Sequence, residues 1–137
     1  MKKTKEMIID RDGKTPQMDI RIDQSQVEQV DKYVYLGHII SNNGTCEMEI
    51  KRRIEIARSK FIELKGILTS REIPVSVRVQ LTRTLIWSVL LYGAEAQTLN
   101  AGMVDKLEAF EMWLYRRILK ISWVQKRTNE EVLQLAC

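Results

Sequence analysis

Residues 47–68 read EMEIKRRIEIARSKFIELKGIL, and the spacing of their apolar side chains decides how the larger part of the chain folds. Apolar residues recur there at steps of three and four, at Ile50, Ile54, Ala57, Phe61, Leu64 and Leu68. At 100° per residue these positions stay within an arc of roughly 80°, which is the apolar stripe of an amphipathic helix. Glu47 and Glu49 lie where the helix dipole favours anions. The sequence therefore predicts a helix that starts near Thr45 and buries one face.

Three further helices are predicted downstream of this stretch. Pro74 suits the first turn of a second helix, which ends near Gly93. Its later half is apolar on almost every side, so we expect it to be the most buried element and expect Trp87 to lie in the core. A third helix spans about residues 101–121, with an apolar face formed by Met103, Leu107, Phe110, Leu114 and Ile118. Thr128 and Glu131 have the spacing of a capping box and predict a short fourth helix.

The first third of the chain has the period of β-strands. Met18, Ile20 and Ile22 alternate with charged residues, as in a half-buried strand. Another apolar stretch, residues 33–36, continues past Gly37 to the turn at residues 42–44. The sequence thus predicts an α+β fold, with a short N-terminal antiparallel β-meander followed by a bundle of three to four helices. The expected parts are residues 1–44, 45–99 and 100–137.

The distribution of charge indicates which part faces an anionic partner. Residues 1–37 carry seven basic and seven acidic side chains, so the net charge of +4 comes from residues 38–137. A helical part that faces nucleic acid would produce such a split. The candidate nucleic-acid-binding residues are Lys51, Arg52, Arg53, Arg58, Lys60, Lys65, Arg116, Arg117 and Lys120. Those on the first helix flank its apolar stripe, Lys51, Arg58 and Lys65 on one side. Such side chains follow a phosphate backbone or extend along the rim of a buried face, and both interpretations stay open.

A second basic cluster lies close to aromatic residues. Arg116, Arg117 and Lys120, together with the later Lys126 and Arg127, are near three aromatic side chains, Trp113, Tyr115 and Trp123. Aromatic rings beside cations suit base stacking and phosphate contact. They suit an ordinary core at the end of a helix as well, and for Trp113 the core interpretation is favoured.

Several classes of enzyme site have no counterpart in the sequence. It contains no Gly-rich phosphate loop, no His-Glu-x-x-His, no Cys-x-x-Cys and no Gly-x-Ser-x-Gly. The single histidine, His38, lies between a glycine and two isoleucines, a setting typical of a structural residue. Asp10 and Asp12 flank a turn with Gly13, where aspartate is favoured for local hydrogen bonds rather than for magnesium. No catalytic residue and no metal ligand is therefore predicted.

Cysteine content and hydropathy bear on localisation. Cys46 and Cys137 are the only cysteines and lie far apart, which indicates a reducing compartment, cytoplasmic or nuclear, and no metal cluster. The longest apolar-rich stretch, residues 85–92, is too short to span a bilayer, so we expect no membrane partner.

Four motifs, taken in order, resemble the non-LTR (LINE-type) retrotransposon endonuclease-reverse transcriptases. They are YLGHIIS at residues 35–41 followed by EIKRRI at 49–54, WSVLLYGAEA at 87–96, LEAFEMW at 107–113 and RRILKISW at 116–123. The resemblance covers about residues 2–133. Each motif is weak by itself, whereas their order and gaps are specific.

The resemblance implies a role for each part of the chain. Tyr35, Leu36 and Gly37 would belong to the primer-grip strand of the palm hairpin, where a glycine lets another backbone approach. Lys3 matches a lysine near the phosphates of the incoming nucleotide. The helices from Thr45 would form the thumb, which grips a template–primer duplex of RNA–DNA or DNA, and a connection segment would start near residue 101.

The sequence departs from the family in ways that bear on activity. The catalytic aspartates of these polymerases, which hold magnesium, lie upstream in the family, partly in a Tyr-x-Asp-Asp turn that this chain lacks. We therefore expect a fragment that needs no cofactor, is inactive alone, and self-associates where the palm face is unpaired. Gln97 replaces a usual tryptophan. The alternative is a stand-alone basic helical module that binds nucleic acid or protein.

Overall fold

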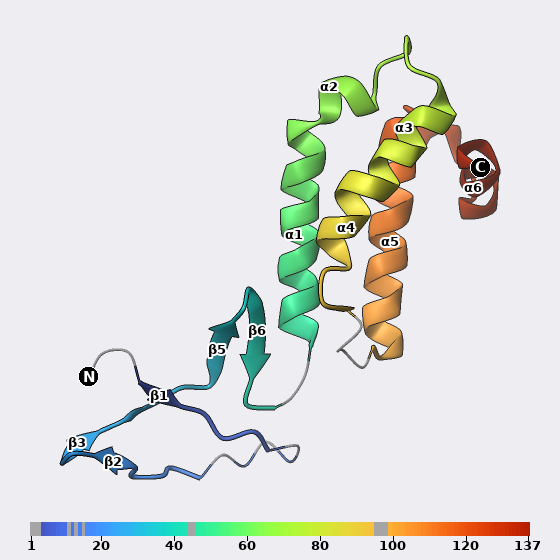
Figure 1. Ribbon diagram of the computed structural model, residues 1–137. Helices are drawn as coiled ribbons and strands as arrows, with labels where there is room; N and C mark the ends of the chain where they lie inside the picture. Colours follow the sequence, from blue (N-terminus) through green and yellow to red (C-terminus); the bar gives the residue numbers. More distant parts are fainter. Residues whose placement is uncertain (1–3, 11, 13, 15, 44–45, 95–98) are drawn as a thin grey trace. The chain divides into compact units, whose positions relative to one another are not determined.

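The chain forms a strand-bearing unit and a helical unit. The computed structural model describes residues 4–10, 12, 14, 16–43, 46–94 and 99–137, and it divides into two compact units, Met1–Glu49 and Ile50–Cys137. The described strands lie in the first unit, and the described helices, apart from the first turn of α1, lie in the second (Figure 1). The α+β fold class predicted from the sequence is confirmed.

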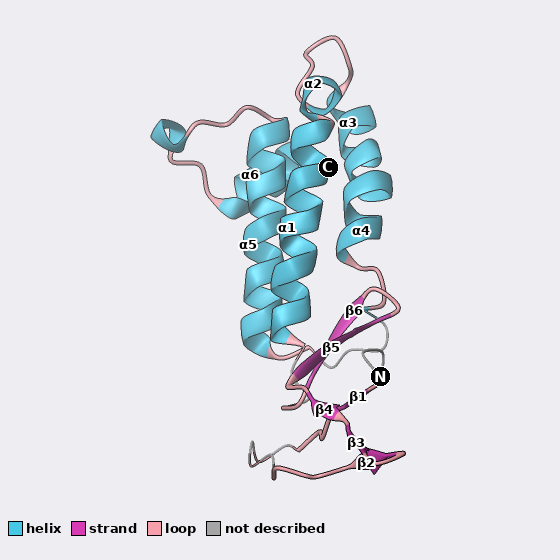
Figure 2. Cartoon of the chain, turned by 90° about the vertical axis from the view of Figure 1, so that its left-hand side faces the viewer, coloured by secondary structure: helices cyan, strands magenta, loops and turns pink. Residues whose placement is uncertain are grey.

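The helical unit is built around one core. Its elements are α1 (Glu47–Glu63), α2 (Lys65–Leu68), α3 (Val75–Thr82), the π-helical turn η1 (Arg83–Trp87), α4 (Ser88–Leu90), α5 (Ala101–Ile118), the 3-10 turn η3 (Trp123–Gln125) and α6 (Asn129–Ala136). Helices α1 and α5 lie side by side (Figure 2), and the rings of Phe61 and Trp113 meet between them with centroids 5.3 Å apart. The segments predicted as 45–99 and 100–137 therefore share a single core.

The apolar stripe predicted for α1 is the face that the helix buries. Ala57 and Phe61 are fully buried, and Ile54 and Leu64 pack at the edge of the same core. The predicted face of α5 is buried in the same way. The expectation that the second helix is the most buried element is wrong, because Leu85 and Leu91 are 40% and 43% exposed. This helix packs on the bundle with one face only, so apolar side chains on its other side remain in solvent.

The start of each C-terminal helix is fixed by a side-chain cap. The Asn100 side chain accepts a 2.9 Å hydrogen bond from the backbone N–H of Met103 at the start of α5. At α6, the Thr128 hydroxyl accepts from the Glu131 N–H and the Glu131 carboxylate accepts from the Thr128 N–H, at 3.3 and 2.8 Å. This reciprocal arrangement is the capping box that the sequence predicted, and it satisfies backbone donors that a helix start otherwise leaves open.

Within the residues that the structure describes, the strand unit consists of three short pairs rather than one meander. The strands are β1 (Lys5–Glu6), β2 (Arg21–Ile22), β3 (Ser25–Gln26), β4 (Glu28–Gln29), β5 (Lys32–Tyr35) and β6 (His38–Ser41). The pairs β2–β3 and β5–β6 are antiparallel as predicted, whereas β1–β4 is parallel because a long excursion, not a tight turn, connects them. Met18 and Ile20 lie outside the strands and are 50% and 42% exposed, so the half-buried strand predicted there is limited to its last residue.

Candidate nucleic-acid interface

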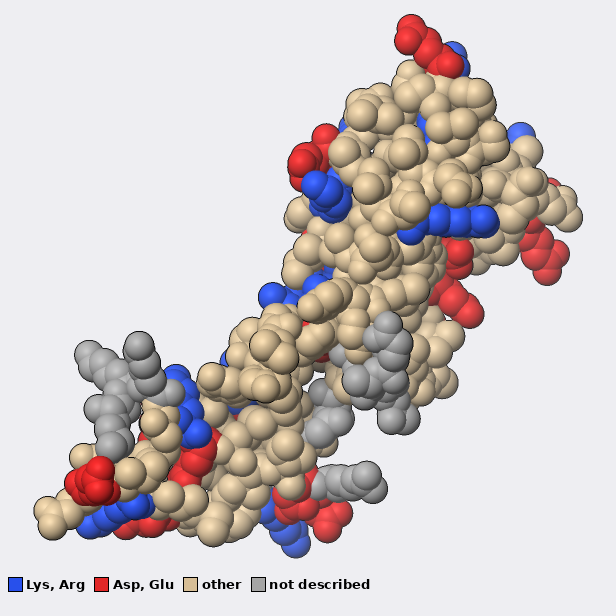
Figure 3. Space-filling model, in the orientation of Figure 1, with Lys and Arg blue, Asp and Glu red and all other residues tan. Residues whose placement is uncertain are grey.

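The excess of positive charge belongs to the helical unit. Residues 50–137 carry fifteen Lys and Arg against nine Asp and Glu, a net charge of +6, whereas residues 1–49 have a net charge of −2. Over the face drawn in Figure 3, cations and carboxylates are interspersed, and the cations form no continuous basic patch. On this face an anionic ligand would therefore contact small local groups of cations, and the geometry of each group determines which contacts it can make.

One such group lines a hollow between α1 and α5, which we call the α1–α5 groove. Its volume is about 420 Å³, and its walls are Lys51, Ile54, Glu55 and Arg58 from α1 with Lys106, Ala109 and Phe110 from α5. Three cations thus surround the groove with one carboxylate. The Nη1 of Arg58 lies 4.0 Å from the Glu55 carboxylate. The Nε of Arg58 is buried, and among the residues that the structure describes it has no hydrogen-bond partner.

Trp113 holds the arginines of this region in place. The guanidinium of Arg58 lies 5.1 Å from the centre of its ring and that of Arg117 lies 4.4 Å from it, distances typical of cation–π contacts. Phe61 meets the indole edge-on and Phe110 stacks beside it with centroids 5.5 Å apart. Trp113 is therefore a packing residue of the α1–α5 interface, as favoured from the sequence, and its ring also orients two candidate cations.

The remaining candidates on α1 and α2 do not line the groove. Lys60 forms an ion pair of 3.0 Å with Glu63. Arg53 lies 4.8 Å over the ring of Tyr92, and Arg52 is half-buried. Lys65 belongs to the separate helix α2, because α1 ends at Glu63.

The cations at the end of α5 have different roles. The Nη2 of Arg116 donates to the carbonyl of Arg127 and to Oδ1 of Asn129, at 2.9 and 3.0 Å, so this guanidinium ties the loop after α5 to the start of α6. Lys120 is exposed and has a left-handed backbone with φ of 54°. Trp123 is 87% exposed, so the core interpretation does not apply to it.

The contact between Arg83 and Tyr115 was not predicted from the sequence. Arg83 opens the π-helical turn and lines a second hollow, of about 430 Å³, between α3 and α6. A hydrogen bond with the Tyr115 phenol raises the pKa of Arg83. Burial raises the pKa of Tyr115, and the hydrogen bond from Arg83 opposes that rise only in part. No pattern of residue types marks a π-turn, so residue spacing did not predict this contact.

In the strand unit, the residues that resemble a primer grip form the turn of a hairpin. Tyr35 ends β5, and Leu36 and Gly37 have φ of 48° and 81°, which is the two-residue turn preferred between antiparallel strands. The positive φ of Gly37 favours glycine at this position. Tyr35 and Leu36 are 57% and 75% exposed. Lys3 lies outside the described residues.

His38 and the acidic residues of this unit have structural contacts. Nδ1 of His38 lies 3.4 Å from Oε1 of Glu49, whose Oε2 accepts a 2.9 Å hydrogen bond from the Ile39 N–H. The Asp12 N–H donates to the Asp10 carboxylate at 3.1 Å, the local hydrogen bond expected at that turn. Among the described residues, no three His, Cys, Asp or Glu side chains gather in a way that could hold a metal ion. Cys46 and Cys137 are free thiols.

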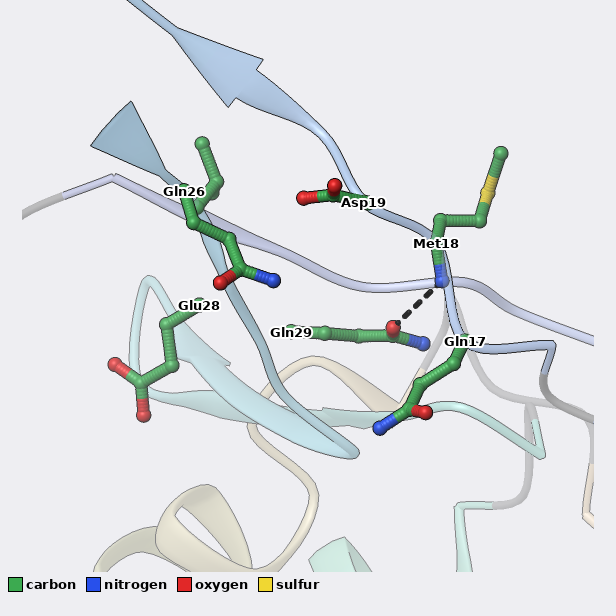
Figure 4. A pocket seen from close by; sticks show the side chains of 7 residues that line it. Gln17, Met18, Asp19, Gln26, Glu28 and Gln29 are labelled. Carbon is green, nitrogen blue, oxygen red and sulfur yellow. Dashed lines mark hydrogen bonds between the residues drawn. The ribbon is translucent and has the colours of Figure 1, made fainter. Parts of the chain in front are cut away.

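One hollow of the strand unit is lined mostly by polar side chains, and several of these have partners (Figure 4). Its volume is about 620 Å³. The Gln29 side chain accepts from the Met18 N–H at 3.2 Å and donates to the Pro16 carbonyl at 3.1 Å. Asp19 pairs with Arg21, and Glu28 lies 3.5 Å from Lys5. These interactions hold the loop at residues 16–19 in place, and we assign no ligand to the hollow.

Comparison with known proteins relates the chain to a mobile element. It is similar to an uncharacterized transposon-derived protein of Caenorhabditis elegans, with 30% identity over 106 residues that make up 77% of this chain. The chain spans 38% of the length of that relative. No protein-family model matches the sequence, and no solved structure matches it. None of the described helices is both long and apolar enough to cross a membrane.

Proposed function

We propose that this chain is part of a non-LTR retrotransposon reverse transcriptase and that its helical unit grips a nucleic-acid duplex. Two observations support the assignment. The four motifs between residues 35 and 123 resemble that family, and the chain is similar to a transposon-derived protein. In this role the helices hold a template–primer duplex of RNA–DNA or DNA and contribute no reacting group.

The α1–α5 groove is the observation that carries the proposal. Arg58 offers a buried Nε–H that has no partner among the described residues, and its guanidinium lies over the Trp113 ring, 5.1 Å from the ring centre. Lys51 and Lys106 lie on the same walls. A phosphate oxygen that accepts from Arg58 would satisfy the open donor, and charge-assisted hydrogen bonds of this kind are stronger than neutral ones. The groove therefore suits one phosphate of a backbone that runs across the two helices.

The proposal assigns positioning rather than catalysis to this part of the enzyme. Two-metal phosphoryl transfer needs carboxylates that hold magnesium in line with the reacting phosphate. The sequence contains no Tyr-x-Asp-Asp turn, the motif that supplies magnesium-binding carboxylates in the family that it resembles. We therefore expect duplex binding without nucleotide incorporation by the 137-residue chain.

Fluorescence anisotropy of a labelled, blunt RNA–DNA duplex tests the proposal. If phosphates are bound, the logarithm of the affinity falls linearly with the logarithm of salt concentration between about 50 and 300 mM. Lys106→Gln should reduce the magnitude of that slope by about one unit for the lost contact. Lys60→Gln is the matched control, because Lys60 is paired with Glu63 away from the groove. No binding at low salt, or equal slopes for both variants, would contradict the proposal.

A protein-interaction role is the second candidate, and the β5–β6 hairpin favours it. All four residues of β5 are exposed, and Val34 and Tyr35 leave more than half of their surface in solvent. Exposed apolar strands pair readily with another strand, so a second copy of this chain is the partner we propose. Light scattering should then give a dimer mass that Val34→Lys reduces to that of a monomer, whereas a monomeric wild-type chain would exclude the dimer.

A further inference from the structure

The segment that joins α5 to α6 carries a strong local excess of positive charge. Between residues 112 and 128 there are five cations and no acidic side chain. The base of this segment is anchored, because Leu119 and Ile121 pack against the core and the Ile121 N–H donates to the Arg116 carbonyl at 2.9 Å. The rest of the segment is therefore held at a fixed place at the end of the bundle.

The tip of this segment presents a tryptophan to solvent. Trp123 and Val124, at 87% and 86%, are the most exposed large apolar side chains that the structure describes. They lie on η3, which stands apart from the neighbouring helices on two connecting loops at the upper left of Figure 2. The turn is closed by the Ser122 hydroxyl, which accepts from the Val124 N–H at 3.2 Å. An indole held outside the core on a hydrogen-bonded turn indicates a contact surface.

The backbone on both sides of the tip adopts an unusual conformation. Lys120 and Lys126 have φ of 54° and 45°, in the left-handed region that residues other than glycine seldom adopt. Such conformations persist where the surrounding structure imposes them, and they are frequent at ligand-binding sites. Here the two lysines lie on either side of the turn that carries Trp123.

Arg116 supports the indole from the side of the bundle. Its guanidinium lies 5.8 Å from the centre of the Trp123 ring, while its Nη2 holds the Arg127 carbonyl and Asn129. The same side chain thus fixes the return of the loop and orients the ring. Because Trp123 stays 87% exposed, a planar group can still stack on the ring from solvent.

We propose that this loop binds single-stranded nucleic acid by stacking an unpaired base on Trp123. Lys120, Lys126 and Arg127 then contact the phosphates on either side of that base. A single aromatic plane bordered by cations matches the stacking platform of single-strand binding sites. A lipid surface would call for a wider apolar face than Trp123 and Val124 provide. The inference goes beyond the proposed duplex grip, which uses the α1–α5 groove.

A short labelled oligonucleotide without secondary structure, such as a 12-mer of oligo(U) or oligo(dT), tests this site in anisotropy titrations of the full chain. Trp123→Ala should weaken binding by roughly tenfold, since stacking on one aromatic ring has about that effect. Trp123→Phe keeps a ring and should stay within a few-fold of wild type. Val124→Ala is the matched control, because Val124 is equally exposed and apolar but offers no ring, and it should bind as wild type does.

Three results would overturn this proposal. They are unchanged affinity in Trp123→Ala, equal losses in Trp123→Ala and Val124→Ala, or Trp123-dependent binding to vesicles of phosphatidylcholine and phosphatidylglycerol with no dependence in the oligonucleotide assay. A blunt RNA–DNA duplex has no unpaired base, so Trp123→Ala should leave its affinity unchanged. A wild-type chain that binds the oligonucleotide but not the duplex would therefore count against the groove alone, and one that binds the duplex but not the oligonucleotide would count against the Trp123 loop alone.

Discussion

Arg78 and Ile118 are joined by a hydrogen bond of 2.5 Å from the guanidinium Nη1 to the backbone carbonyl at the last residue of α5. The Nε of Arg78 also donates to the Ile73 carbonyl at 2.9 Å, and the side chain is only 7% exposed. The last carbonyls of a helix have no partner within the helix, and a cation near them also interacts favourably with the helix dipole. Arg78 is therefore a cation used for packing and not for a ligand.

Replacing Arg78 by methionine should lower the free energy of unfolding by about 2–3 kcal/mol, because two carbonyls lose a charged donor. Urea unfolding followed by circular dichroism measures this loss. Arg71→Met is the matched control, since Arg71 is exposed, and such a change should stay within about 0.5 kcal/mol. Equal stability of both variants would show that the buried guanidinium makes no net contribution to the free energy of unfolding.

Glu49→Ala should loosen the β5–β6 hairpin. Glu49 is 1% exposed and accepts the Ile39 N–H, so its loss leaves a partly buried donor without this acceptor, at a cost of about 1–3 kcal/mol. Hydrogen exchange measured at individual amides should show faster exchange at Ile39. Glu28→Ala, at an exposed strand position, should leave the rate at Ile39 unchanged, and an unchanged rate in Glu49→Ala would refute the contact.

Tyr115 should make stability depend on alkaline pH. Because burial raises the pKa of its phenol above the ordinary value of 10.0, the folded chain holds this proton more tightly than the unfolded chain. The stabilisation is complete below pH 10 and is lost as pH rises through the higher folded pKa. The difference in unfolding free energy between wild type and Tyr115→Phe should therefore shrink above pH 10. Tyr35→Phe, at an exposed position, provides the comparison, and a difference independent of pH would contradict this account.

Hydrogen exchange should protect the helical unit more than the strand unit. The strands are two to four residues long, whereas Phe61, Leu114 and Ile118 are fully buried in the helical core. Local opening is easiest where few apolar contacts hold the backbone. Amides of α1 and α5 should exchange slowly and those of β1 to β4 rapidly. Strand amides that exchange more slowly than those of α5 would contradict this expectation.

Features set by local periodicity were the ones that the sequence predicted well. The burial of Ala57 and Phe61 follows from the spacing of apolar residues along one helix, and the cap at Thr128 follows from two residues three positions apart. The parallel pairing of β1 with β4 depends on residues more than twenty positions apart, and no local pattern encodes it. The exposure of the second helix was missed for a related reason, because it depends on how many neighbours a helix has.

The sequence predicted that the candidate interface is basic, but it predicted only some of the residues that line it. The sequence placed Lys51 and Arg58 on one flank of α1, and both line the α1–α5 groove. Lys106 was missed because it lies on α5, and only the packing of two helices brings it to the same hollow. The exposed position of Trp123 also depends on where α5 ends and how the chain returns to α6, which residue spacing does not reveal.

The most direct test of the duplex grip is the NMR signal of the Arg58 Nε–H group during titration with a blunt RNA–DNA duplex. The account predicts that this signal shifts and that its shift saturates together with the fluorescence anisotropy, because a phosphate oxygen accepts from the buried donor. The signal of the exposed Arg71 should stay in place under the same conditions. An Arg58 signal that does not move when the duplex is fully bound would show that the α1–α5 groove does not contact the backbone.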